Sequence, residues 1–245
     1  EIGVRLVGSE MCIRDRYGIY IIDEANIETH GMGSVPYFKD TIPHPAYRSE
    51  WYAAHVDRIT RMVERDKNHP CVIGWSLGNE CGNGIVFHDE YKRLKEYDPS
   101  RFVQFEQAWE DWNTDIVCPM YPNMWKITEY AKSGKQRPFI MCEYAHAQGN
   151  SNGNFKDLWD VIYDSPNLQG GFIWDFMDQG FKMKTEPGDG RIYWTYNGKM
   201  GSYKWLEDRK GELNTGTDGL ISANGIPKPQ AYEVKKVYQL SLIHI

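Results

Sequence analysis

The sequence has 245 residues, enough for one large domain or two small ones with a proper core. Its 28 lysines and arginines and 34 aspartates and glutamates give a formal net charge of −6. This charge argues against binding to nucleic acid or to an acidic membrane surface, because both require a positive patch. A hydrophobic content of 41% and a charged content of 25% are typical of globular proteins and exclude a disordered or fibrous chain. No apolar run approaches about twenty residues, so no membrane-spanning helix is predicted.

Short β-rich runs alternate with helical patterns along the chain. Runs of apolar, β-branched and aromatic residues predict strands at 17–23, 71–77, 101–106, 116–119, 139–142 and 171–174, the first buried on both faces. Apolar residues at helical spacing predict helices at 49–66, around 89–96, around 155–162 and at 232–238, the first with Ser49 as its N-cap. Residues 181–230 are rich in Gly, Lys, Asp and Pro without sustained periodicity, which predicts loops.

Strands separated by helices indicate βαβ units and a parallel sheet. Polar residues follow most of the predicted strands, at positions 23–24, 79–80, 106, 121, 143 and 174–175. A (β/α)8 TIM barrel carries its chemistry at the carboxyl ends of its strands, so this pattern favours the α/β barrel. A doubly wound sheet would bring its ligands to one switch point, and the sequence has no GxGxxG or Walker loop.

Both ends of the sequence differ from the rest. Residues 1–14 and 240–245 show no coherent period and resemble translated sequencing-adapter read-through, although an irregular native terminus is the alternative. We therefore expect non-native ends at 1–14 and 240–245 around a partial catalytic barrel domain at 15–239.

Two glutamates stand just past predicted strands in apolar surroundings, Glu80 in WSLGNE and Glu143 in FIMCEY. Hydrolysis of a glycosidic bond with retention needs two carboxyl groups about 5–5.5 Å apart, one as acid/base and one as nucleophile. A salt bridge at the barrel rim is the alternative interpretation for either glutamate alone. The occurrence of both after strands of one barrel favours catalysis.

Six segments carry a resemblance to a known family: ANIETHGM (25–32), NHPCVIGWSLGNECGNG (68–84), DPSRFVQFE (98–106), TDIVCPMYP (114–122), RPFIMCEYAHAQGNS (137–151) and LQGGFIWDFMDQG (168–180). From about residue 15 to 221 the chain resembles the lac-type β-galactosidases of glycoside hydrolase family 2. The related β-glucuronidases and β-mannosidases share the Asn-Glu pair, but CEYAHAQGNS resembles the galactosidase form.

The resemblance implies a role for each matching residue. Glu80 corresponds to the general acid/base and Glu143 to the nucleophile that forms a covalent galactosyl-enzyme. The remaining matches are Asn79 to the amide that binds the sugar 2-hydroxyl, Tyr121 to the phenol that touches the nucleophile, His146 to a histidine that binds sugar hydroxyls, and Trp174 to the indole under the galactose ring.

Two cation sites are implied in the same way. Glu28, His30 and Glu80 match ligands of the family's Mg2+, whereas Glu-Thr-His alone indicates an ordinary strand-end hydrogen-bond network. Asp218 lies where the family places a side chain near a second cation, Na+ or K+, that contacts the sugar 6-hydroxyl. Well-known members have an amide there, and an aromatic residue where this chain has Thr215, so a loop-capping aspartate is the alternative for Asp218.

The resemblance also implies that the chain is incomplete. We expect strands three to eight of the eight-stranded barrel, and inactivity of the chain by itself. The expected function of the whole protein is hydrolysis of terminal non-reducing β-D-galactose residues, with a β-galactoside as substrate. The alternatives are a non-catalytic carbohydrate-binding barrel, an inactive fragment or another family 2 hydrolase. Homo-oligomerisation of the full-length protein and its bacterial compartment, cytoplasm or periplasm, stay open.

Overall fold

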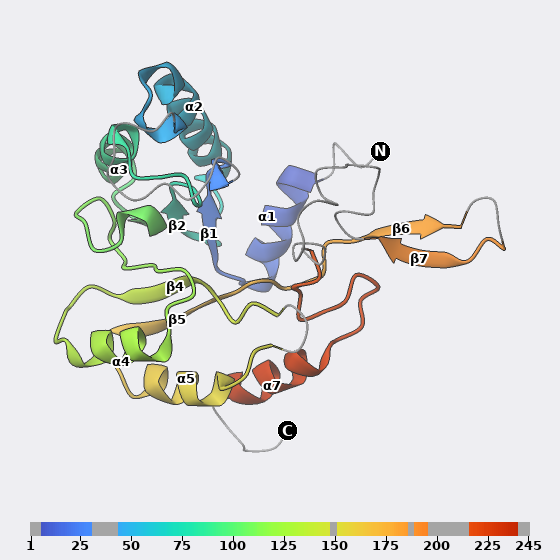
Figure 1. Cartoon of the computed structure of the whole chain (residues 1–245). Coiled ribbons are helices and arrows are strands. Elements are labelled where there is room, and N and C mark those ends of the chain that lie inside the picture. Colours follow the sequence, from blue (N-terminus) through green and yellow to red (C-terminus); the bar gives the residue numbers. More distant parts are fainter. Residues whose placement is uncertain (1–5, 31–43, 148–150, 186–188, 196–215, 240–245) are drawn as a thin grey trace. The chain divides into compact units, whose positions relative to one another are not determined.

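The computed structural model describes residues 6–30, 44–147, 151–185, 189–195 and 216–239 (Figure 1). The chain divides into two compact units, Glu1–Pro119 with Gln136–Ile140, and Met120–Lys135 with Met141–Ile245. Within the described ranges, every helix is too short or too polar to cross a membrane.

A parallel three-stranded sheet forms the centre of the first unit. Its order is β1 (Ile21–Glu24), β2 (Val72–Ser76) and β3 (Phe102–Gln104), with Asp23 opposite Trp75 and Trp75 opposite Val103. The helices of this unit are α1 (Leu6–Tyr17), α2 (Ser49–Asp66) and α3 (Ile85–Tyr97), with short 3-10 helices η2 (Pro45–Tyr47) and η3 (Glu106–Ala108). Strands joined by helices are the reason that the sheet is parallel.

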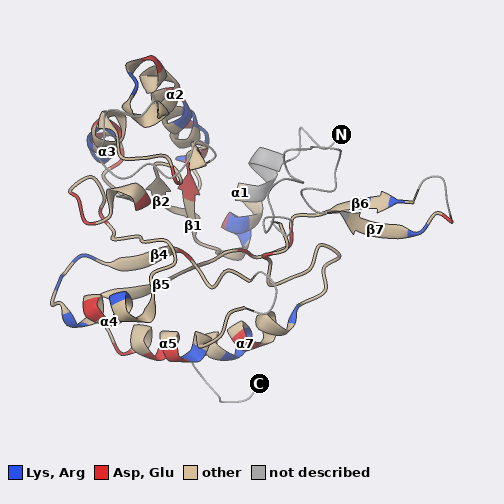
Figure 2. Ribbon diagram, in the orientation of Figure 1, with Lys and Arg blue, Asp and Glu red and all other residues tan. Residues whose placement is uncertain are grey.

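The core of this unit lies between the sheet and the helices α2 and α3. Trp75, Phe87 and Phe105 are fully buried, and the rings of Phe87 and Phe105 stack with centroids 4.3 Å apart. The indole N–H of Trp75 donates to Asp98 at 3.0 Å, so the one polar atom of this large side chain is satisfied. Along the ribbons of α2 and α3, both positively and negatively charged residues occur (Figure 2).

The second unit contains a two-stranded sheet of β4 (Phe139–Tyr144) and β5 (Leu168–Ile173), where β4 begins in the first unit. Its helices are α4 (Met124–Lys132), α5 (Phe155–Tyr163) and α7 (Pro229–Tyr238). An aromatic cluster joins α5 and α7 to β4: the rings of Tyr144 and Phe155 stack, the Trp159 indole N–H donates to the Tyr144 hydroxyl at 3.0 Å, and the Tyr238 ring of α7 lies 4.8 Å from that of Trp159. The same unit contains an antiparallel hairpin of β6 (Phe181–Lys184) and β7 (Ile192–Thr195).

The sequence predictions hold for most of the regular elements but shift at their ends. The helix at 49–66 is confirmed with both bounds, while the strand predicted at 71–77 covers Val72–Ser76 and the helix predicted at 89–96 extends over Ile85–Tyr97. Ser49 is not the N-cap, because Arg48 holds that position without a side-chain hydrogen bond and Ser49 is the first helical residue.

Three further segments were predicted wrongly. The strand predicted at 17–23 begins only at Ile21, because α1 continues through Tyr17 and ends at Gly18, whose φ of +67° favours glycine. Tyr20 is 75% exposed, so the run is not buried on both faces. The segment 116–119 forms only an isolated parallel bridge, between Val117 and Phe139, and the region predicted as loops contains the hairpin of β6 and β7.

The strands of the described ranges form sheets of three, two and two, and these ranges contain no closed barrel. The parallel β1–β2–β3 sheet with its intervening helices has the local arrangement that the barrel prediction requires.

A buried pair of carboxyl groups connects β1 to the end of α2. Asp23 is 9% exposed, and its carboxyl group interacts with that of Asp66, which is itself 1% exposed. Arg65 reaches both, at 2.5 Å from Asp66 and 3.7 Å from Asp23. Burial and the neighbouring Asp66 raise the pKa of Asp23 to about 7. Asp23 therefore keeps a proton in the folded chain at pH values where an unfolded aspartate has lost it.

This pKa predicts a pH-dependent stability. Because the folded state binds the extra proton between about pH 4 and pH 7, the free energy of unfolding falls as pH rises through that window. Urea denaturation at pH 5 and pH 8 should show a decrease on the order of 2 kcal/mol for the unsubstituted chain. This decrease should be smaller in Asp23→Asn, where buried Glu106, whose pKa is also raised to about 7, still contributes, and it should be unchanged in the exposed control Asp57→Asn. An equal pH dependence in the unsubstituted chain and in Asp23→Asn would contradict the assignment.

Candidate functional site

Polar side chains gather where β1 and β2 end in the first unit. The pairing of the two strands continues past their regular residues, since Ala25 N donates to Ser76 O at 3.0 Å and Asn79 N donates to Ile27 O at 2.9 Å. A parallel bridge then sets Glu28 beside Asn79. The segment after β1 and the segment after β2 therefore present their side chains at one edge of the sheet.

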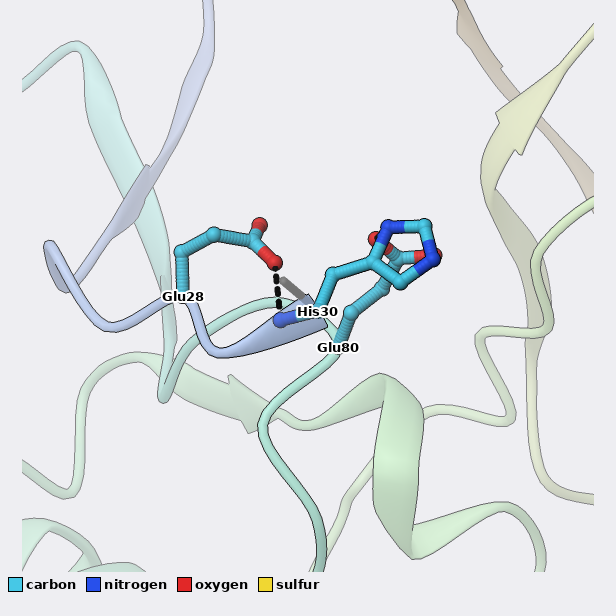
Figure 3. Close-up of side chains that lie close together, drawn as sticks. All are labelled: Glu28, His30 and Glu80. Carbon is cyan, nitrogen blue, oxygen red and sulfur yellow. Dashed lines mark hydrogen bonds and ion pairs between the residues drawn. The ribbon is translucent and has the colours of Figure 1, made fainter. Parts of the chain in front are cut away.

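Glu28, His30 and Glu80 form a cluster at this edge (Figure 3). His30 Nδ1 lies 2.6 Å from Glu80 Oε2, and the Glu28 carboxylate accepts the His30 backbone N–H at 3.0 Å. The other Glu28 oxygen accepts from the Asn79 amide at 2.7 Å, which orients this carboxylate toward the cluster. One ligand atom from each of the three residues lies within 4.8 Å of the others.

The donor set of this cluster suits a hard divalent cation. Two carboxylates supply oxygen ligands, and Mg2+ keeps several waters in its shell beside one or two carboxylates. Two of the three side chains are exposed, so water can reach such an ion. The residues present therefore fit Mg2+.

Burial raises the pKa of Glu80 above its usual range. The nearby His30 opposes this shift, and the negative charge of Glu28 adds to it. A carboxyl group whose pKa is raised holds its proton longer as pH increases, which is the property of a general acid.

The backbone at Glu80 is unusual. Its φ of +44° lies in the left-handed region, which costs a residue with a side chain on the order of 1–3 kcal/mol. Gly78 precedes it with φ +147°, where an added Cβ would approach Ile27 O and Cys81 Sγ to about 3 Å. Glu80 is partly exposed in this turn, whereas Leu77 and Cys81 on either side of it are fully buried.

Glu106 is a buried acid just after β3 that was not predicted as a site residue. It is 5% exposed, and one of its oxygens accepts the Glu80 backbone N–H at 2.7 Å. Burial raises the pKa of Glu106 to about 7. Its place directly after a strand is the signal that could have marked it, because Glu80 and Glu143 occupy the same kind of position.

The second unit holds the other predicted residues, with Tyr121 and Glu143 in direct contact. Tyr121 N donates to Glu143 O at 2.8 Å, and the Tyr121 hydroxyl donates to Glu143 Oε2 at 2.7 Å. Burial and the Glu143 carboxylate raise the pKa of Tyr121, so the phenol stays protonated as the donor. A phenol that donates to a carboxylate fixes its orientation and lowers its basicity.

His146, Asp218 and Trp174 lie in the same unit. The His146 ring centroid is 5.7 Å from that of Tyr121, and His146 Nε2 is 3.7 Å from an oxygen of Asp218. Asp218 is 5% exposed, and its Oδ1 has no hydrogen-bond partner. Trp174 N donates to Tyr144 O, and its side chain is 37% exposed.

The predicted site residues therefore form two groups. Glu28, His30, Asn79 and Glu80 come together in the first unit, and Tyr121, Glu143, His146, Trp174 and Asp218 belong to the second. Thr215, whose position was compared with a family aromatic, lies outside the described residues.

Comparison with protein families identifies the chain. Residues 9–243 match the model described as "Glycosyl hydrolases family 2, TIM barrel domain". The chain belongs to glycosyl hydrolase family 2. The family resemblance inferred from the six segments is confirmed, and the family domain supports the TIM-barrel fold class.

Curated relatives agree with this membership. The chain is 43% identical over 244 residues to a protein of Alteromonas mediterranea named "Beta-galactosidase", which covers 94% of the chain and 22% of the relative. It is also 43% identical over 239 residues to a protein of Photobacterium profundum with the same name, covering 92% and 22%. The family 2 chain thus spans a little over one fifth of the length of these relatives.

Solved structures support the fold. The "beta-D-Glucuronidase" of Dictyoglomus thermophilum has a TM-score of 0.61 at 18% identity, over 96% of this chain and 43% of that one. At this identity the likeness concerns the fold alone.

Proposed function

We propose that the protein to which this chain belongs is a retaining β-galactosidase that hydrolyses terminal non-reducing β-D-galactose residues. The observation that carries the proposal is the 43% identity to proteins named "Beta-galactosidase" across 94% of the chain, a range that includes both candidate glutamates. A glycosidase activity also agrees with the local chemistry, since Glu80 has a raised pKa and Glu143 carries an oriented carboxylate.

In the proposed reaction, Glu143 attacks the anomeric carbon while Glu80 transfers its proton to the leaving glycosidic oxygen. The C–O bond to the aglycone breaks, and the sugar becomes attached to Glu143 as an ester. Glu80, now a carboxylate, removes a proton from water, whose oxygen attacks the anomeric carbon and releases Glu143. Two inversions at this carbon give overall retention.

The other residues are assigned to binding on the family resemblance. Asn79 would hydrogen-bond the sugar 2-hydroxyl and His146 other hydroxyls, while the Trp174 indole would stack on the galactose ring. Tyr121 would tune Glu143 through the hydrogen bond between them. Asp218, with its unpartnered buried oxygen, would lie near a monovalent cation, Na+ or K+.

Glu28, His30 and Glu80 would hold Mg2+ in this proposal. Bound there, the ion would supply positive charge beside Glu80 and fix the position of its carboxylate. The protein contribution is the orientation of these ligands, through the Asn79 amide and the His30 backbone N–H that both bond Glu28.

We further propose that the chain supplies strands three to eight of the family barrel, and that it is inactive by itself. Its coverage of about 22% of the relatives agrees with a part of a larger enzyme. Another family 2 activity, such as β-glucuronidase, and a non-catalytic carbohydrate-binding barrel are the alternatives. Hydrolysis of aryl β-galactosides but not aryl β-glucuronides or β-mannosides by the full-length protein distinguishes them.

The nucleophile assignment predicts a covalent label. Incubation of the full-length protein with an activated 2-deoxy-2-fluorogalactoside should trap the glycosyl-enzyme, because the fluorine slows both its formation and its hydrolysis while the activated leaving group speeds its formation alone. Peptide mass spectrometry should find the sugar on Glu143, and Glu143→Gln should remain unlabelled. Labelling of another carboxylate would refute the assignment.

The acid/base assignment predicts a dependence on the leaving group. Glu80→Gln cannot protonate the leaving oxygen, so kcat/KM for an alkyl galactoside should fall by about 100-fold or more. For a dinitrophenyl galactoside, whose leaving group needs no proton, kcat/KM should fall much less. Equal losses for the two substrates in steady-state kinetics would rule out an acid role for Glu80.

The metal assignment predicts a loss of affinity. Glu28→Gln removes one of the two ligand charges, so Mg2+ should bind at least about tenfold more weakly. Isothermal titration calorimetry of the full-length protein after chelator treatment measures this affinity. Glu50→Gln, at an exposed position in α2, is the matched control. Equal affinity in the two variants would argue against this ligand set.

A further inference from the structure

The two peptide groups that flank the Glu80 Cα each bond to a side chain from another part of the first unit, one to the buried Glu106 and the other to the partly buried Thr29. Glu80 has φ +44°, a conformation that a residue with a Cβ adopts only where its surroundings impose it. Bonds to its N–H and C=O are therefore the means by which the chain can hold this geometry. Both are present among the described contacts.

The N–H side is held by Glu106. Its Oε1 accepts the Glu80 N–H at 2.7 Å, and its Oε2 accepts from the Gln107 amide at 2.7 Å. Both carboxyl oxygens are thus engaged, and the side chain is 5% exposed. A buried acceptor with two bonds has little freedom to move, so it fixes the peptide that it binds.

The C=O side is held by Thr29 and His44. The Thr29 hydroxyl donates to Glu80 O at 3.4 Å, and the same hydroxyl lies 2.9 Å from His44 Nε2. His44 Nδ1 accepts the Ala46 backbone N–H at 3.4 Å. This acceptor role puts the histidine proton on Nε2, which donates to Thr29 and leaves the threonine hydrogen for the Glu80 carbonyl.

These hydrogen bonds require a neutral His44 ring, and the surroundings of His44 favour that form. It is 2% exposed, and burial together with the nearby His55 lowers the pKa of His44, which favours the neutral ring. A protonated ring could not accept from Ala46. Each of the three hydrogen bonds from Ala46 through His44 and Thr29 to Glu80 therefore has one donor and one acceptor.

We propose that Glu106 and the Thr29–His44 pair are positioning residues that hold the Glu80 peptide groups so that its carboxyl group meets the leaving oxygen. This inference rests on the proposed function, in which Glu80 is the acid/base. None of the three residues transfers a proton to the substrate; they act through the backbone of Glu80. Loss of either bond lets the strained turn relax and displaces the carboxyl group, and a displacement of about 1 Å can cost on the order of 100-fold in rate.

The test compares Glu106→Met with Glu106→Gln in the full-length protein. Methionine has no acceptor for the Glu80 N–H, whereas the glutamine side-chain oxygen keeps one. Glu90→Met is the matched control, because Glu90 is 2% exposed and paired with Arg93 but makes its bonds within α3. Active sites are first counted with the fluorosugar, so that unfolded protein does not enter the rates.

Glu106→Met should lower kcat/KM for an alkyl galactoside by about tenfold or more relative to a dinitrophenyl galactoside. Glu106→Gln should keep this ratio within about threefold of the unsubstituted protein, and Glu90→Met should lower Tm without changing the ratio. Equal losses on both substrates in Glu106→Met, or the same ratio as in Glu90→Met, would overturn the proposal.

Thr29→Val and Thr29→Ser provide a second pair if Glu106→Met fails to fold. Valine removes the hydroxyl at nearly constant shape and serine keeps it, so only valine should change the substrate ratio. An unchanged ratio in Thr29→Val would also overturn the proposal. Failure of the proposed function itself is distinguishable, because it appears in the unsubstituted protein as absence of galactosidase activity or of a label on Glu143.

Discussion

Parallel pairing between β1 and β2 is the interaction on which the first group of site residues depends. The ladder extends past the regular strands to the contact between Asn79 N and Ile27 O, and this contact sets Glu28 beside Asn79. Because parallel strands end at one edge, residues more than fifty positions apart share a single cluster there. The Glu80 turn follows directly, with its left-handed backbone held from β3 and from the segment after β1.

In the second unit, parallel main-chain pairing also aligns the site residues, but over fewer residues. A parallel bridge between Met120 and Glu143 and the bond from Tyr121 N to Glu143 O align the two segments. The Tyr121 phenol then reaches the Glu143 carboxylate without any intervening group. In both units, main-chain pairing fixes the position of a carboxyl group, and a side chain of the paired segment donates a hydrogen bond to it.

Elements with strong periodicity were predictable from the sequence. The amphipathic pattern of 49–66 corresponds to α2, and the apolar run at 71–77 to β2, because these patterns report burial directly. The run at 17–23 misled because Gly18 ends a helix at that point, which an apolar pattern does not reveal. The hairpin of β6 and β7 was missed because β6 is only four residues long, with all four exposed, so its alternating FKMK sequence is too short to stand out and does not report burial.

The acids at the strand ends were predictable from the sequence, whereas the residues that hydrogen-bond to the Glu80 backbone were not. Glu28, His30 and Glu80 were expected together on the family resemblance, and the structure brings them together. The Thr29–His44 contact joins residues fifteen positions apart and no local pattern marks it. Glu106 had the strand-end signal, but its bond to the Glu80 backbone depends on the tertiary fold.

The most direct test of the account is the separation of the Glu80 and Glu143 carboxyl groups in a crystal structure of the full-length protein trapped with the fluorosugar. Retaining double displacement by this pair predicts about 5–5.5 Å between them, with Glu80 keeping its positive φ and its bond to Glu106. A separation of about 6.5–9.5 Å, as in inverting enzymes, would contradict the assignment of Glu80 and Glu143 as acid/base and nucleophile.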